Sequence, residues 1–175
     1  MTARYRRPRL LQPDDSLDEF ESRSPEQTVW LREHARQAHA AGTAKVLVVT
    51  GADSPSVVAY YAWAIAGITV VDAPPRFRKG AGRYPQPVAL LARLSVDIGH
   101  EGRGLGAAML RDVISRVAEL GTHLGCRGLL VHAESEEARS FYLHTIPGFE
   151  PSPTDPLHLV LLMKDIRHTL LGSVG

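Results

Sequence analysis

The sequence is poor in cysteine and in aromatic residues, and it contains no long apolar run. Of its 175 residues only Cys126 is a cysteine, which excludes an internal disulfide. Cys126 lies in the lead-in to an apolar strand, which favours a buried structural thiol over redox chemistry or zinc binding. No stretch reaches the roughly 18 apolar residues that a bilayer span needs, and the N-terminus lacks the apolar segment of a secretory signal. We therefore expect a cytoplasmic protein that does not engage a membrane.

The motifs of the common hydrolases and metalloenzymes are missing as well. The eight histidines form no H-E-x-x-H or similar cluster, so we expect no metal site. There is no G-x-S-x-G nucleophile elbow and no Cys–His pairing, which argues against a nucleophilic hydrolase.

Charge is nearly balanced overall but uneven along the chain. The net charge of +1 does not by itself indicate a nucleic-acid-binding protein. A basic segment lies in the Pro/Gly-rich stretch PPRFRKGAGR, and its charged residues are Arg76, Arg78, Lys79 and Arg83. It is either an ordinary solvated loop or a phosphate-binding patch. A second cluster is expected to be a frayed basic tail and comprises Arg4, Arg6, Arg7 and Arg9.

Length and composition predict one globular domain over residues 24–170, preceded by a poorly specified lead-in over residues 1–23. Apolar and β-branched stretches predict strands at KVLVVT, VVAYYAWAI, VALLARLSVD, RGLLVHA and HLVLLMKDI, the first two forming a hairpin. Amphipathic periodicity predicts a helix from Leu105, and Ser135 is placed to cap another over EEARSFYLH. This order of elements predicts an α/β fold, with a mixed sheet and helices on its faces.

The first helix has clear start and stop signals. Ser24 is a candidate N-cap, Pro25 suits the first helical position and Gln27 suits a capping box. Gly42 ends the predicted helix after about Ala41. Its apolar face is expected to carry Trp30, His34, Ala38 and Ala41.

A glycine-rich turn joins the VALLARLSVD strand to the helix that starts near Leu105. The stretch VDIGHEGRGLGAAMLRDV leaves backbone N–H groups unpaired at the positive end of a helix dipole, which is an anion site suited to phosphate. The missing G-K-[ST] ending excludes a Walker A loop, and the G-x-G-x-G spacing disfavours a dinucleotide fingerprint. A tight turn that binds no ligand remains the alternative.

Several stretches together resemble the GCN5-related N-acetyltransferase (GNAT) family and, within it, the toxins of GNAT-type type II toxin–antitoxin modules. They are LARLSVDIGHEGRGLGAAMLRDV, LVHA, EARSFYL and GFEPSPTDP. The resemblance implies a GNAT fold, in which a mixed sheet splays between two parallel strands and has helices on both faces. It also implies acetyl-CoA as co-substrate, with no metal.

The family's [QR]-x-x-G-x-[GA] loop, which receives the pyrophosphate of acetyl-CoA, falls here on residues 101–106. Glu101 departs from the pattern, and a carboxylate facing a pyrophosphate would be unfavourable, so we expect it to point away. The resemblance makes Ser95 and Val96 backbone contacts to the thioester. The expected pyrophosphate contacts are Arg103, Gly104, Leu105, Gly106 and Ala107.

Tyr142, in SFYL, falls on the tyrosine that the family uses as general acid to protonate the leaving thiolate. A phenol with a reference pKa of about 10 is protonated at neutral pH. Without the resemblance, Tyr142 would be interpreted as a packing residue of an amphipathic helix. The stretch from Thr145 to Pro147 lengthens the family's spacing by about two residues, which puts the geometry at the end of this helix in question.

The resemblance implies that the chain acetylates the α-amine of the amino acid on charged tRNA and so blocks translation. A free α-amine has a reference pKa of about 7.7 to 8.0, so no strong catalytic base is needed. Five basic residues are the expected tRNA contacts: Arg76, Arg78, Lys79, Arg83 and Arg93. The implied protein partners are a ribbon-helix-helix antitoxin and a second copy in a homodimer. The alternatives are acetylation of a small amine or a protein N-terminus, and an inactive regulator that binds acetyl-CoA. The sequence does not reveal which tRNA or amino acid is the substrate.

Overall fold

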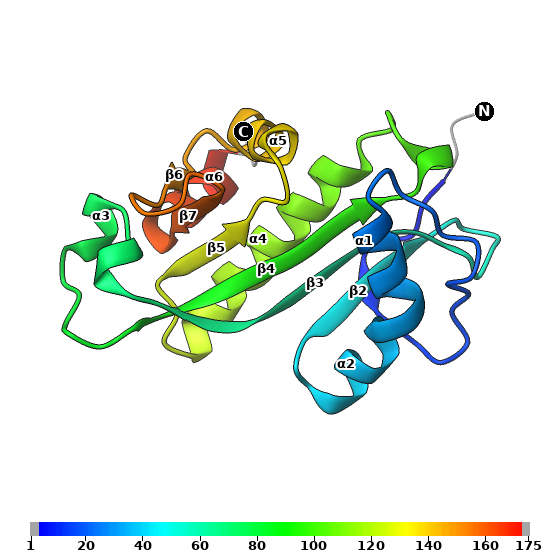
Figure 1. Cartoon of the computed structure of the whole chain (residues 1–175), viewed down its shortest axis with the longest axis horizontal. Coiled ribbons are helices and arrows are strands. Elements are labelled where there is room, and N and C mark those ends of the chain that lie inside the picture. Colours follow the sequence, from blue (N-terminus) through cyan, green and yellow to red (C-terminus); the bar gives the residue numbers. More distant parts are fainter. Residues whose placement is uncertain (1–3, 173–175) are drawn as a thin grey trace. The chain divides into compact units, whose positions relative to one another are not determined.

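The computed structural model describes residues 4–172 and has the mixed α/β fold that the sequence predicts. Its strands are β1 (Arg9–Leu10), β2 (Lys45–Thr50), β3 (Val57–Ile68), β4 (Gln86–Val96), β5 (Gly128–His132), β6 (Glu150–Pro151) and β7 (His158–Leu162). Its α-helices are α1 (Pro25–Val29), α2 (Ala35–Ala41), α3 (Pro75–Arg78), α4 (Leu105–His123), α5 (Glu136–Thr145) and α6 (Met163–Gly172). The strands follow the order β1-β2-β3-β4-β5-β7-β6 in one sheet. Figure 1 labels β2 to β7.

The chain packs as two compact units. Among residues 4–172, the first comprises residues 4–64 and 92–112, and the second comprises residues 65–91 and 113–172. Three long elements, β3, β4 and α4, each contribute residues to both units. None of the helices within residues 4–172 is long and apolar enough to cross a membrane.

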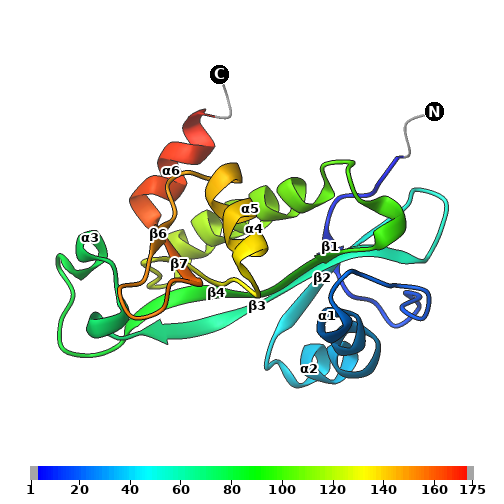
Figure 2. The same cartoon turned by 45° about the horizontal axis from the view of Figure 1, so that its top comes forward.

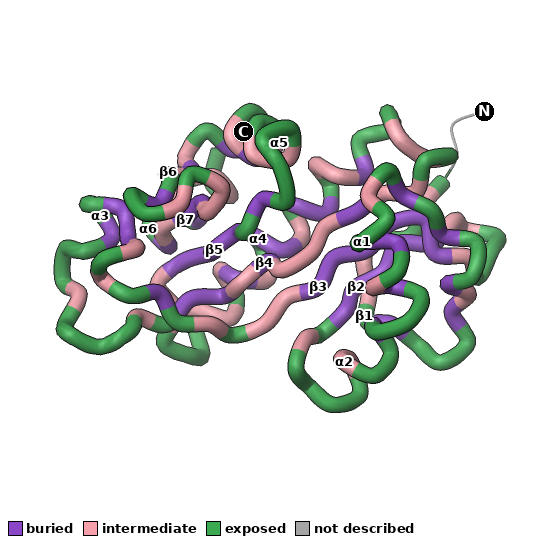
Figure 3. Tube along the Cα trace, viewed as in Figure 1, coloured by how far each residue is buried: buried purple, intermediate pink, exposed green. Residues whose placement is uncertain are grey.

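In the first unit, the predicted hairpin is confirmed, because β2 and β3 pair antiparallel with Val48 opposite Tyr60. Alternate residues of these strands face α1 and α2, which lie together on one side of β2 (Figure 2). The buried core on that side consists of Leu11, Leu17, Phe20, Leu31, Ala35, Val46, Val48, Val57, Tyr60 and Ala62. On the other side, the Tyr61 hydroxyl donates a hydrogen bond of 2.6 Å to Asp112 of α4. Burial on both sides explains why these strands are apolar almost throughout (Figure 3).

The start and stop signals of the first helix are confirmed, but its predicted apolar face is only partly confirmed. Ser24 Oγ accepts the Gln27 N–H at 3.2 Å, and Gly42 ends α2 in the left-handed conformation with φ of +78°. However, a π-helical turn separates α1 from α2 over Trp30–His34. Leu31 and Ala35 are the buried apolar residues between Pro25 and Ala41, and Trp30 packs partly buried against the same core. His34 and Ala41 are exposed, since the apolar Leu31 rather than the polar His34 fills the core. Gln27 completes no capping box with its side chain, whose oxygen instead accepts a hydrogen bond from Arg93.

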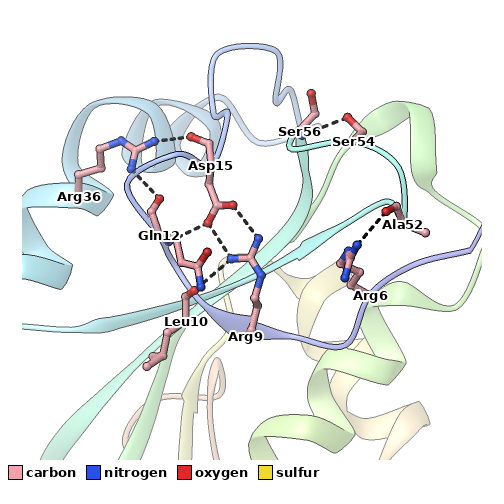
Figure 4. Close-up of polar contacts among 9 residues, drawn as sticks. All are labelled: Arg6, Arg9, Leu10, Gln12, Asp15, Arg36, Ala52, Ser54 and Ser56. Atoms are coloured by element: carbon pink, nitrogen blue, oxygen red, sulfur yellow. Dashed lines mark hydrogen bonds and ion pairs between the residues drawn. The ribbon is translucent and has the colours of Figure 1, made fainter.

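The segment before the first helix is well anchored, so the prediction of a frayed basic tail is wrong for Arg6 and Arg9. Arg9 lies in β1, and its guanidinium donates two hydrogen bonds of 2.8 and 2.7 Å to the carboxylate of the buried Asp15 (Figure 4). Burial alone would raise the pKa of Asp15, but the bonds from Arg9 and from the Gln12 N–H outweigh it and lower the pKa. Arg36 of α2 also bonds the Asp15 carbonyl, and Arg6 bonds the Ala52 carbonyl at 3.1 Å.

In the second unit, β4 and β5 run parallel, with Ala89 opposite Leu129, and β5 pairs antiparallel with β7. One side of these strands packs against the short helix α3 around the fully buried Phe77. The core on that side consists of Ile68, Ala73, Phe77, Val88, Leu130 and Val160. The basic segment is therefore not a simple loop, because a helical turn within it anchors Phe77.

The end of the chain differs from the prediction. The stretch HLVLLMKDI is only partly a strand, because β7 ends at Leu162 and α6 begins at Met163. Met163 and Ile166 are both buried, and their spacing of three suits one face of a helix. The Met163 N–H bonds the Arg127 carbonyl at 3.0 Å, and Asp165 lies in the first turn, where a negative charge is favourable.

Candidate active site

The glycine-rich turn of the first unit begins with a fixed strand end. Asp97 follows β4 and its carboxylate accepts the N–H groups of Gly99 at 2.8 Å and Glu21 at 2.9 Å. The Asp97 N–H in turn bonds the Val58 carbonyl at 2.8 Å. A short 3-10 helix over Ile98–His100 leads from there into the turn. The predicted thioester contacts, Ser95 and Val96, are the last residues of β4 before this anchor.

Two glycines give the turn its shape. Gly102 and Gly104 have φ of +75° and +80°, a region that other residues rarely adopt. Helix α4 then begins at Leu105. The N–H groups of Leu105, Gly106 and Ala107 lie in its first turn, where a helix offers them no carbonyl partner. The turn thus has the donors and the positive dipole end that a phosphate group requires.

Glu101, the residue that departs from the family pattern, is turned toward the segment before α1. Its carboxylate accepts a hydrogen bond from Arg23 Nε at 3.0 Å and forms an ion pair with Arg23 Nη2 at 2.9 Å. The guanidinium offsets the negative charge that the carboxylate would otherwise place beside the turn. This pairing supports the expectation that Glu101 points away from an anion.

Tyr142 lies in α5 of the second unit, and its side chain is buried against the rings of Phe141 and Phe149. Burial, reinforced by the charge of Glu134, raises the pKa of Tyr142 well above its usual value. The hydroxyl forms no hydrogen bond with any residue in the described range 4–172. A neutral phenol that is not bonded within the protein is suited to donate a proton to a bound group.

The additional residues after Tyr142 form an ordered helix end. The Ile146 N–H bonds the Tyr142 carbonyl at 2.9 Å, and the Phe149 N–H bonds the Ile146 carbonyl at 3.2 Å. Ile146 and Phe149 are both buried. The stretch from Thr145 to Pro147 therefore continues the packing around α5.

Some side chains of the basic segment are bonded within the protein, and others are not. Arg76 bonds Glu150 at 2.6 Å and Asp165 at 2.9 Å, which raises the pKa of Arg76. Arg78 donates to the Ala73 carbonyl at 2.9 Å. By contrast, the side chains of Lys79 and Arg83 form no hydrogen bond or ion pair with any residue from 4 to 172. Of the predicted tRNA contacts in this segment, only Lys79 and Arg83 have side chains that are free of such bonds.

Arg93, the remaining predicted tRNA contact, belongs to β4 in the first unit. Its guanidinium stacks over the Trp30 ring at 4.7 Å from the centroid. It also donates to Glu26 at 3.0 Å and to Gln27 at 2.9 Å. These contacts fix its orientation while leaving the side chain partly exposed.

One residue near the turn escaped the sequence analysis. The Tyr5 hydroxyl lies 2.8 Å from both Arg103 Nη1 and His100 Nδ1. It is separated from them by more than ninety positions in sequence, so no local pattern could have indicated it.

Cys126 is half-buried rather than buried, and within the described residues no group of three His, Cys, Asp or Glu side chains is placed to hold a metal.

Comparison with known proteins identifies the family and the fold of the chain. No protein-family model matches the chain. The sequence is 44% identical to a tRNA-acetylating toxin of Mycobacterium tuberculosis over 169 residues, which are 97% of this chain and 98% of that protein. The fold matches the toxin AtaT complexed with acetyl-methionyl-tRNAfMet, with a TM-score of 0.85 and 21% identity over 93% of this chain and 98% of that one.

A second solved structure shows the same fold in a different complex. A tyrosine-to-phenylalanine mutant of AtaT, bound to acetyl-CoA and to the C-terminus of the antitoxin AtaR, matches with a TM-score of 0.78. The identity is 20%, over 94% of this chain and 97% of that one. The identity to the mycobacterial protein extends over nearly the whole of both chains. The chain belongs to the tRNA-acetylating toxins, the GNAT-type toxins of toxin–antitoxin modules.

Proposed function

We propose that this chain transfers an acetyl group from acetyl-CoA to the α-amine of the amino acid on charged tRNA, and thereby blocks translation. The observation that carries the proposal is the 44% identity to a tRNA-acetylating toxin over almost the whole chain. The turn at 102–107 supports it independently, because its unpaired N–H groups suit the pyrophosphate of acetyl-CoA.

Different residues of the chain bind the co-substrate and take part in the chemical step. The amides from Arg103 to Ala107 bind the pyrophosphate, and Ser95 and Val96 orient the thioester through their main chain. The neighbouring ester lowers the pKa of the α-amine below its reference value of about 7.7 to 8.0, so that much of the amine is an unprotonated nucleophile at neutral pH. Orientation in the ternary complex therefore replaces a strong base. As the new C–N bond forms and the C–S bond breaks, Tyr142 gives its proton to the departing sulfur, and the proton that the amine nitrogen loses restores the Tyr142 phenol. Its raised pKa keeps that proton in place until it is needed.

Substrate and partners follow from the same assignment. Lys79, Arg83 and Arg93 contact the charged tRNA, whose phosphates attract exposed cations. Arg76 and Arg78 contribute positive charge to the basic segment around Lys79 and Arg83 while remaining bonded within the protein. The AtaT complex with an antitoxin segment supports an antitoxin partner for this chain, which we propose to be of the ribbon-helix-helix type. We further propose that the chain forms a homodimer and acts in the cytoplasm, where charged tRNA is found.

The proposal is tested by incubating the protein with total charged tRNA and isotopically labelled acetyl-CoA. Nuclease digestion followed by mass spectrometry then identifies acetylated aminoacyl-adenosines. We expect label on at least one aminoacyl-adenosine and none on uncharged tRNA. Label only on polyamines or protein N-termini, or no label at all, would overturn the proposal.

A further inference from the structure

Tyr5 is anchored beside the end of β2 by its own backbone and by its neighbours. It forms a β-bridge with Gly51. The Ala52 N–H bonds the Arg4 carbonyl at 3.0 Å, and the Arg6 N–H bonds the Thr50 carbonyl at 2.9 Å. The position of the Tyr5 ring is therefore set by the sheet, and the same unit also contains the turn at 102–107.

The Tyr5 hydroxyl links two residues of the turn region. Arg103 Nη1 donates to the Tyr5 oxygen at 2.8 Å, and a second hydrogen bond of 2.8 Å joins the Tyr5 hydroxyl to His100 Nδ1. The Tyr5 and His100 rings meet edge to face with centroids 5.6 Å apart. The hydroxyl is thus hydrogen-bonded to two residues of the turn region within the first unit.

Arg103 retains donors for an external anion. Its side chain is exposed, and its guanidinium carries five N–H groups, of which the contact with Tyr5 uses one. An exposed arginine ordinarily loses rotamer freedom when it binds a ligand. A bond that already holds the guanidinium next to the amides of the turn lowers this cost before the ligand arrives.

We propose that Tyr5 is a positioning residue for acetyl-CoA, holding Arg103 in the orientation in which its guanidinium contacts a phosphate of the nucleotide part. This inference rests on the proposed function, because it assigns the turn to acetyl-CoA. Tyr5 acts only through Arg103 and His100 and does not take part in acetyl transfer. Its effect is therefore on the affinity for the nucleotide and not on the chemical step.

The test uses Tyr5→Phe, which keeps the ring and its edge-to-face contact with His100 and removes the hydroxyl together with its hydrogen bonds to Arg103 and His100. We expect KM for acetyl-CoA to rise about three- to tenfold, the loss typical of one charge-assisted hydrogen bond, with kcat unchanged. Arg103→Ala should raise KM at least as much, and the double variant should raise it no further than Arg103→Ala. With acetyl-pantetheine, which has no phosphates, Tyr5→Phe and wild type should react equally. Tyr84→Phe, at a tyrosine with 81% of its surface exposed, is the matched control.

Three results would overturn the inference. They are unchanged KM in Tyr5→Phe, additive effects of the two substitutions, and an equal loss with acetyl-pantetheine. A comparison of acetyl-CoA with its 3′-dephospho form identifies the phosphate that Arg103 contacts. If Arg103 binds the 3′-phosphate, Tyr5→Phe should have no effect on KM for the dephospho form. If Arg103 binds the pyrophosphate, the effect of Tyr5→Phe on KM should persist. A wild-type protein that does not use acetyl-CoA would refute the proposed function, which separates that failure from a failure of Tyr5.

Discussion

The glycine-rich turn at 102–107 and the basic segment at 76–83 both appear in the sequence as candidate phosphate-binding stretches, yet they differ in which hydrogen-bond donors they leave free for a ligand. In the turn, the donors are backbone N–H groups, exposed because Gly102 and Gly104 adopt positive φ and α4 begins directly afterwards. In the basic segment, the donors are side chains. Two of the four are occupied within the protein, because Arg76 is bonded to carboxylates and Arg78 to a main-chain carbonyl.

The difference arises because local sequence determines the donors of the turn, whereas residues far away in sequence determine which side chains of the basic segment are free. Glycine spacing and a following helix determine the availability of backbone amides locally. The availability of an arginine depends on residues far away in sequence, since Glu150 and Asp165 lie 74 and 89 positions from Arg76. A glycine pattern is therefore a better guide to an anion site than a cluster of basic residues.

The largest expected effect separates binding at the turn from chemistry elsewhere. Tyr142→Phe should lower kcat by about a hundredfold, the scale of losing a general acid, while the Kd for acetyl-CoA stays within about twofold, because the turn is untouched. Single-turnover acetylation of charged tRNA together with calorimetric titration measures both quantities. A variant that retains wild-type kcat would remove Tyr142 from the mechanism and leave it a packing residue.

The protonation state of Tyr142 gives a second prediction at the same residue. Burial disfavours the phenolate and raises the pKa of Tyr142, so this tyrosine should remain protonated beyond the usual value of about 10. Ultraviolet titration of wild type minus Tyr142→Phe should show no tyrosinate signal from this residue at or below that pH. Ionisation at a lower pH would mean that the side chain is more solvated than its burial indicates.

Within the basic segment, substitution of the side chains that are bonded within the protein should have different effects from substitution of those that are not. Lys79→Ala combined with Arg83→Ala should raise KM for charged tRNA several-fold and reduce the slope of log affinity against log salt by about 2, about 1 for each contact removed. The matched pair, Arg76→Ala and Arg78→Ala, should change the salt slope less and lower Tm more, because it breaks bonds within the protein. Equal salt slopes for the two pairs would contradict the distinction.

The smallest expected effect concerns Glu101. Arg23→Gln leaves the Glu101 carboxylate unpaired and should weaken acetyl-CoA binding by up to about fivefold, within the range of an exposed ion pair. Glu101→Gln should bind acetyl-CoA as well as wild type or slightly better, and the double variant should resemble Glu101→Gln. Calorimetric titration of the three variants measures these differences. Tighter binding in Arg23→Gln would show that Arg23 does not offset this carboxylate.

The parts of the fold that local chemistry determines were predictable from the sequence. Ser24, Pro25 and Gly42 marked the first helix, and the glycines before Leu105 marked the turn. The residues of the candidate site that depend on long-range partners were not predictable. No local pattern shows that Arg23 would pair with Glu101, that Tyr5 would reach Arg103, or that Arg76 would be occupied by carboxylates. The helix α6 was missed because its first turn continues an apolar strand without a break in composition.

The most direct test of the account compares the same strained substitution in the two segments. Gly104 and Gly80 have φ of +80° and +82°, and a Cβ at either position would meet no atom within 4 Å, so valine imposes similar backbone strain at both. Calorimetric titration with acetyl-CoA should show a Kd at least about tenfold higher for Gly104→Val. Gly80→Val should bind acetyl-CoA like the wild type. Unchanged affinity in Gly104→Val, or an equal loss in both variants, would contradict the claim that the backbone of the glycine-rich turn holds acetyl-CoA.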